Sequence, residues 1–217
     1  MSIEIREMFI HQSKYALKSP YEMQPKYITV HNTANDAPAI NEIKYMSNNV
    51  LSTSFHFAVD DKEIIQALPL NRNGFHCTDG SKGPGNRSSI GIEICYSKSG
   101  GERYTAAEEK AVKLIAHLLL KYGWGIDRVK QHNHWYKKNC PHRIRDEGRW
   151  NSFLQRIETE MQPGKVDAPQ VGTEIIEQPK PQPIQKPAQQ PNNLIRNGSR
   201  GEEVKRIQAA LGVAADG

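Results

Sequence analysis

A proline-rich segment divides this chain of 217 residues and limits where a core can form. Residues 162–191 contain seven of the 13 prolines and almost no large apolar side chains. Such a segment buries too little surface to offset the entropy that it loses on ordering, so we predict an extended, semi-rigid linker rich in Pro and Gln. The folded core is therefore expected within residues 1–161. Residues 192–217 are too few for a core of their own, although apolar spacing predicts a short amphipathic helix there.

The first 161 residues alternate between strand and helix signals. Apolar and β-branched runs predict strands, and apolar residues at helical spacing predict helices. A capping box formed by Thr105 and Glu108 marks the expected start of the clearest helix, which should end at Gly123. These signals predict an α/β fold with a central mixed β-sheet flanked by helices. The expected strands are 27–31, 54–59, 64–68 and 89–96, with 54–68 forming a hairpin, and the expected helices are 36–50 and 105–123.

Composition restricts the possible compartments and partners. The sequence has no apolar run of 18 residues, so no membrane span is expected. Its first residues lack the basic and apolar regions of a secretory signal, which predicts synthesis in the cytosol. The three cysteines suggest reduced thiols or a metal ligand rather than a disulfide framework. A net charge of +5 favours an anionic partner, namely nucleic acid, a membrane surface or an anionic cell wall. The lysines and arginines are scattered and do not form a stripe interleaved with aromatic residues. Nucleic acid is therefore the least favoured of the three partners.

One loop combines residue types that bind metals. His132 and Cys140 are separated by eight positions, and a loop of this length can bring both side chains to one ion. His31, at the end of an apolar strand, is a candidate third ligand. On the residues alone the alternatives stay open, because a half-buried thiol near surface histidines, or a hydrogen-bonded strand histidine, would leave the same pattern.

Five ordered motifs resemble one family. The chain is similar to the zinc-dependent N-acetylmuramoyl-L-alanine amidases of type 2, and especially to Bacillus-type phage endolysins and prophage autolysins. The likeness covers roughly residues 20–155. It is carried by VHNTA at 30–34, SFHFAVDD at 54–61, GFHC at 74–77, GIEIC at 91–95 and HNHWYKKNCP at 132–141.

This resemblance implies a metal site and a reaction. It implies that His31, His132 and Cys140 hold Zn²⁺, and the spacing to Cys140 favours His132 over its competitor His134. The implied reaction is hydrolysis of the amide bond between the lactyl group of N-acetylmuramic acid and L-alanine in peptidoglycan. The alternative on the same fold is a non-catalytic protein that recognises muropeptides. A nucleic-acid-binding zinc protein is a weaker third hypothesis.

The resemblance also implies catalytic roles for two charged residues. Glu93 would be the general base and then the general acid, and Lys138 would stabilise the oxyanion. On the residues alone, Glu93 is interpreted as an ordinary solvent-facing carboxylate of a strand, and Lys138 as a solvated charge in a loop. The chain departs from some family members at Phe55, where those members carry a tyrosine, so a hydroxyl is missing here.

Four further residues are candidates for substrate binding. Asn32 and Thr33 are small polar residues that follow His31, and His76 lies in a family motif and is expected to line the groove. Trp135 either packs within the ligand loop or stacks on a sugar. His56 fits equally well as a buried, hydrogen-bonded strand histidine.

The resemblance extends to the organisation of the whole chain. The expected domains are a zinc amidase catalytic domain at 1–161, the linker at 162–191 and a partial peptidoglycan-binding module at 192–217. The module likeness covers Leu194 to Leu211, and such modules usually continue past an Asp-Gly like the one at 216–217. The expected partners are peptidoglycan and anionic wall polymers, with no nucleic acid and no membrane. We expect a monomer that is made in the host cytoplasm and acts on the wall after release.

Overall fold

The computed structural model describes residues 3–162. The predicted linker, apart from Gln162, and the predicted C-terminal module lie outside the described residues. Within 3–162, none of the helices combines the length and apolarity needed to cross a bilayer.

A mixed sheet of six strands forms the centre of the described domain, as predicted. Its spatial order is β1-β4-β3-β5-β2-β6. The hairpin pair β3 and β4 is antiparallel, whereas the other neighbours run parallel. The strands are β1 (Arg6–Glu7), β2 (Tyr27–Asn32), β3 (Phe57–Val59), β4 (Ile64–Gln66), β5 (Ser89–Ile94) and β6 (Val129–Gln131).

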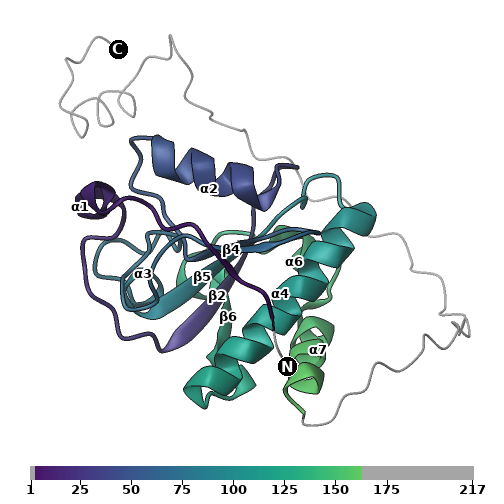
Figure 1. Ribbon diagram of the computed structural model, residues 1–217. Coiled ribbons are helices and arrows are strands. Elements are labelled where there is room, and N and C mark those ends of the chain that lie inside the picture. The colour runs from purple at the N-terminus through teal and green to yellow at the C-terminus, as the bar shows by residue number, and fades with distance from the viewer. Residues whose placement is uncertain (1–2, 163–217) are drawn as a thin grey trace, which may run out of the picture. The chain divides into compact units, whose positions relative to one another are not determined.

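Helices cover both faces of this sheet. In Figure 1, α2 lies over one face, and α4 and α7 lie over the other. The α-helices are α1 (Tyr15–Lys18), α2 (Ala39–Asn48), α3 (Pro84–Ser88), α4 (Gly101–Tyr122), α5 (His132–Trp135), α6 (His142–Asp146) and α7 (Trp150–Met161), and the 3-10 helices are η1 (Gln12–Lys14) and η2 (Ile126–Arg128).

The pairing of β2 with β5 separates an apolar face from a polar one. Val30 lies opposite Ile92, and both side chains are fully buried. One residue further along, His31 lies opposite Glu93. Because successive side chains of a strand point to opposite faces, the apolar pair faces α4 while His31 and Glu93 project together on the α2 side. The parallel register therefore places two polar residues 62 positions apart side by side.

The predicted elements are present with adjusted ends. The hairpin is confirmed but shorter, and strand 89–96 ends at Ile94, before Tyr96 with its positive φ of 59°. The helix expected over 36–50 spans Ala39–Asn48. Asp36 does not cap it, because its Oδ1 accepts hydrogen bonds from the backbone and hydroxyl of Ser99.

The capping box predicted at Thr105 and Glu108 is wrong. Helix α4 begins one turn earlier, at Gly101, and Thr105 lies inside it with Oγ1 donating to the Gly101 carbonyl. Gly100 and Gly101 have φ values of 73° and 72°, a conformation that glycine adopts without steric cost. These glycines turn the chain into the helix. The predicted end is confirmed, because Gly123 takes the left-handed conformation there.

Instead of capping α4, Glu108 joins it to α7. Its buried carboxylate accepts hydrogen bonds from Arg149 at 2.7 and 3.1 Å and from Arg156. Burial alone would raise the pKa of Glu108, but the hydrogen bonds from the two guanidinium groups outweigh burial and hold the pKa below its ordinary value.

We expect Glu108→Gln to lower the free energy of unfolding at pH 7 by about 1–3 kcal/mol, because two arginines lose a buried charged acceptor. A carboxyl with a depressed pKa stabilises the fold above the unfolded pKa of 4.5, and this stabilisation is lost as the pH falls through the lower folded value. The difference in the free energy of unfolding between wild type and variant should therefore become smaller in acid. Urea unfolding at pH 7 and below pH 4 measures it. Glu109→Gln, next along the helix with an exposed carboxylate, is the matched control and should cost less than about 1 kcal/mol.

Candidate active site

Three parallel strands deliver polar side chains to one edge of the sheet. β2 lies between β5 and β6, and Val30 pairs with Gln131. The residues that follow Val30 and Gln131 are both histidines, so His31 and His132 leave the sheet side by side. The carboxyl ends of parallel strands are where α/β sheets commonly bind ligands.

Cys140 reaches the same edge because the loop after α5 is closed on itself. The backbone N–H of Asn133 donates to the Cys140 carbonyl at 3.1 Å. The side-chain amide of Asn133 donates to the Lys138 carbonyl at 3.0 Å. These two bonds explain how an eight-residue separation brings Cys140 back beside His132.

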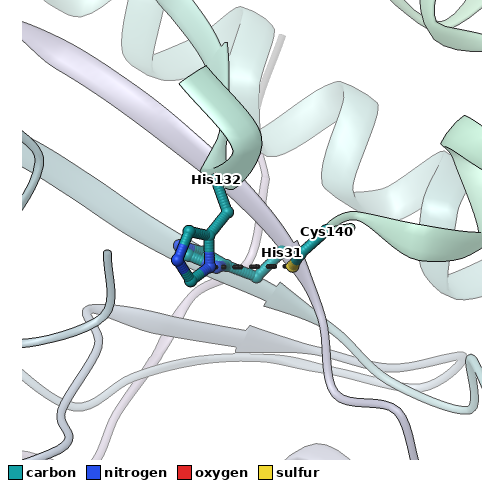
Figure 2. Close-up of side chains that lie close together, drawn as sticks. All are labelled: His31, His132 and Cys140. Atoms are coloured by element: carbon teal, nitrogen blue, oxygen red, sulfur yellow. Dashed lines mark hydrogen bonds between the residues drawn. The ribbon is translucent and has the colours of Figure 1, made fainter. Parts of the chain in front are cut away.

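The side chains of His31, His132 and Cys140 converge on one point. Figure 2 shows them meeting from β2, from the start of α5 and from the loop that follows it. His31 Nδ1 lies 3.1 Å from His132 Nδ1 and 3.7 Å from Cys140 Sγ. All three are buried. The competitor His134 is exposed and packs edge-on against the Trp135 ring.

This donor set fits a zinc ion. Zinc–ligand bond lengths with tetrahedral angles require separations of about 3.3 Å between two nitrogens and about 3.6 Å between nitrogen and sulfur. Burial, followed by the nearby His76, His132 and Lys138, lowers the pKa of His31 well below its ordinary value. Burial and Lys138 lower the pKa of His132 to about 4. Both imidazoles are therefore neutral and offer a lone pair.

Burial keeps the cysteine of the group protonated unless a metal ion is bound. Burial, with a smaller contribution from Glu93, raises the pKa of the Cys140 thiol to about 12. A thiolate at this position thus needs a bound positive charge, which a zinc ion supplies.

A cleft of about 260 Å³ opens beside the three side chains. It is bordered by the ends of β2 and β5, by α2 and by the loop that carries Cys140. Its lining includes Thr33, Glu42, Phe55, Glu93, Lys138 and Cys140. Phe55 thus lies in the cleft but brings no hydroxyl to it.

Glu93 faces this cleft next to the histidines. One carboxylate oxygen, Oε1, lies 4.0 Å from His31 Nδ1. The other, Oε2, is buried and finds no hydrogen-bond partner among the described residues, and the same holds for Thr33 Oγ1. Burial and the carboxylate of Glu42 raise the pKa of Glu93 to about 8, against the opposing effect of Lys138. Both residues line the cleft, and neither of these two atoms is committed to a partner within residues 3–162.

Asn32 borders the cleft, but its side chain is committed elsewhere. Its Oδ1 accepts from the backbone N–H of Arg143 at 3.0 Å, and its Nδ2 donates to the Tyr104 hydroxyl at 3.3 Å. As the residue after His31 on the same strand, it points to the α4 face. Its amide therefore joins β2 to α4 and α6.

His76 and Trp135 do not belong to the lining of this cleft. His76 lies behind His31, with its Nδ1 2.9 Å from His31 Nε2. Trp135 packs within the loop, where its Nε1 donates to the buried Thr29 hydroxyl at 2.8 Å. His56 is a buried histidine whose ring nitrogens contact the Gly91 N–H and the Arg72 carbonyl.

Thr78 was missed by reasoning from the sequence. Its hydroxyl oxygen lies 2.8 Å from His132 Nε2, so it contacts the ring nitrogen that points away from His31. The only available signal was its place directly after the GFHC motif. Partners of this kind orient metal-binding histidines.

Comparison with known proteins agrees with this geometry. Residues 21–143 match the model of the Amidase_2 family, described as N-acetylmuramoyl-L-alanine amidase, and this span is more than half of the chain. The chain belongs to this amidase family. The resemblance drawn from the five motifs is thereby confirmed.

Relatives of this Amidase_2 chain include two N-acetylmuramoyl-L-alanine amidases of Bacillus subtilis (strain 168). XlyB is 59% identical over 164 residues, which cover 76% of this chain and 52% of XlyB. CwlA is 50% identical over 216 residues, which cover 97% of this chain and 79% of CwlA. The chain thus spans about half the length of XlyB. The solved structure of PlyL has 54% sequence identity and a TM-score of 0.70, covering 71% of this chain and 97% of PlyL.

Proposed function

We propose that this chain is a zinc-dependent N-acetylmuramoyl-L-alanine amidase that hydrolyses the bond between the lactyl group of N-acetylmuramic acid and L-alanine. The observation that carries the proposal is the convergence of His31, His132 and Cys140 beside the carboxylate of Glu93. Membership of the Amidase_2 family supports the same reaction.

His31, His132 and Cys140 are the residues that would hold the zinc ion. Bound there, zinc would supply Lewis acidity for the scissile carbonyl and for the attacking water. Three protein ligands leave room for one more, which is the arrangement of catalytic rather than structural zinc sites.

Glu93 carries the proton transfers in this proposal. Its side chain lines the cleft, where its carboxylate takes a proton from water and then passes it to the amino group of L-alanine as that group leaves. Lys138, whose side chain borders the same cleft, places a positive charge where the oxyanion develops. Because Phe55 has no hydroxyl, the role that a tyrosine at this position has in some family members falls to Glu93.

The proposed substrate sets the place of action. A peptidoglycan amidase acts on the cell wall, and we assign the chain to lytic enzymes of the endolysin or autolysin type. The net charge of +5 suits attraction to anionic wall polymers.

Digestion of purified Bacillus subtilis peptidoglycan tests the reaction directly. The expected products are new L-alanine amino termini, identified by labelling the amines before acid hydrolysis. A chelator should abolish their release, and added zinc should restore it. New reducing sugar ends in place of amines would overturn the assignment. Binding to the wall without any new termini would favour a non-catalytic recognition protein instead.

A further inference from the structure

His76 is a buried histidine that the reaction proposed above does not use. Its ring lies behind His31, on the side away from the cleft, and the two rings meet edge to face with centroids 5.0 Å apart. His76 Nδ1 is 2.9 Å from His31 Nε2, and His76 Nε2 is 3.2 Å from the Ser89 carbonyl oxygen. One imidazole therefore links a strand backbone to a proposed metal ligand.

The Ser89 carbonyl oxygen determines which ring nitrogens of His76 and His31 carry a hydrogen. A carbonyl oxygen only accepts, so His76 Nε2 carries a hydrogen and donates it to Ser89. The neutral His76 ring then has its lone pair on Nδ1, which accepts from the N–H at His31 Nε2. With its hydrogen on Nε2, His31 has its lone pair on Nδ1. This is the atom that lies 3.1 Å from His132 Nδ1 and 3.7 Å from Cys140 Sγ.

We propose that His76 is a positioning residue, which selects the tautomer of His31 and holds its ring so that Nδ1 is presented to the metal. The inference rests on the zinc site of the proposed function. It extends that site by a relay from the Ser89 carbonyl through His76 to His31. Relays of this kind are worth tenfold to a hundredfold in metal affinity.

Two glycines keep the His76 ring in this orientation. A Cβ atom on Gly91 would lie 2.8 Å from two carbons of the ring, and one on Gly74 would lie 3.0 Å from Cδ2. Both distances are shorter than van der Waals contact, so the ring packs directly against the backbone of β5 and of the 74–77 segment. A larger residue at Gly91 would push the ring off its line to His31.

Cys77 offers an alternative reading of the same histidines. Its Sγ lies 3.0 Å from His76 Nδ1, and with His31 these atoms form a second group that could hold a metal. The separation of 3.0 Å between Cys77 Sγ and His76 Nδ1 is well below the roughly 3.6 Å that zinc requires between sulfur and nitrogen, whereas Cys140 Sγ lies 3.7 Å from His31 Nδ1. Burial and nearby Asp79 raise the pKa of the Cys77 thiol well above its ordinary value, so it stays protonated. The side chains of Thr29 and Ser89 also hydrogen-bond with Cys77, which leaves the single lone pair of His76 Nδ1 to the His31 N–H.

The test measures zinc affinity of the full chain by competition with a chelating dye. His76→Phe keeps a ring between the glycines but removes both nitrogens, and its Kd for zinc should rise about 10–100-fold. His76→Asn restores an acceptor at the position of Nδ1 and should recover most of that affinity. His56→Phe, which removes a neighbouring buried imidazole that does not contact His31, should leave the Kd within about threefold of wild type. Thermal unfolding of each metal-free variant identifies any that fail to fold.

Each outcome has a definite reading. Weak zinc binding by His76→Phe together with recovery in His76→Asn supports the relay. A His76→Phe affinity equal to that of wild type overturns the relay and leaves the zinc site intact. Two tightly bound zinc ions per wild-type chain, reduced to one in His76→Phe, would also overturn it, because His76 would then be a ligand. No zinc binding by wild type would overturn the metal centre itself, and the relay with it.

Discussion

Glutamine in place of Glu93 should lower the rate of amide hydrolysis by about two to four orders of magnitude while the zinc content stays unchanged. The substitution keeps the shape of the side chain and removes the proton acceptor. Glu93 Oε1 lies 4.0 Å from His31 Nδ1, close enough to serve the same water as the metal but outside the group formed by His31, His132 and Cys140. Release of L-alanine amino termini gives the rate, and elemental analysis gives the metal content.

The Glu109→Gln variant is a suitable control for this experiment. It removes the charge of a carboxylate on α4, on the opposite side of the sheet, and should hydrolyse peptidoglycan at the wild-type rate. Loss of zinc from Glu93→Gln would contradict the assignment, because the carboxylate would then belong to the ligand set. An unchanged rate would exclude Glu93 as the base.

His132→Ala should lose both zinc and activity. Zinc sites built from protein side chains bind with about 10–16 kcal/mol, so each of four ligands accounts for about 3 kcal/mol, or about a hundredfold in Kd. The same dye competition measures this Kd, and peptidoglycan digestion at limiting zinc measures the activity. Zinc affinity and activity should fall together, because the proposed reaction takes place at the zinc ion.

The loop provides its own matched control two residues away. His134 is exposed and does not contact His31 or Cys140, so His134→Ala should keep zinc affinity and activity close to wild type. If His134→Ala lost zinc and His132→Ala retained it, the ligand assignment would be reversed. Circular dichroism checks that the buried His132 is not needed for folding.

Much of the sheet could be predicted from local patterns, whereas the pairing of its strands could not. Strands β2 and β5 have clear apolar signals, and both are present. Nothing in either segment shows that His31 will lie opposite Glu93, because register depends on contacts between distant residues. Strand β6 has only three residues, too short for a period to emerge, yet it is the strand that brings His132 beside His31.

The alternation of side chains along β2 bears on the expected role of Asn32. His31 and Asn32 are consecutive in one strand, so their side chains point to opposite faces, and Asn32 borders the cleft while its amide bonds to Tyr104 and Arg143. The start of α4 is a different case. Thr105 and Glu108 form a sound capping signal locally. In the structure, however, Gly100 and Gly101 start the helix, and Arg149 and Arg156 are the partners of Glu108.

The residues of the site are held in two ways, some by the sheet and others by the closed loop between Asn133 and Cys140. His31, Glu93 and, through β6, His132 are held by hydrogen bonds of the sheet, the most rigid element of the fold. Cys140 and Lys138 belong to a segment tied down by two bonds at Asn133. The exposed residues His134, Tyr136 and Lys137 between these ties can change in size and charge without moving the sheet-borne groups. One wall of the cleft is therefore built by a loop that tolerates substitution, whereas the groups beneath it are held by the sheet.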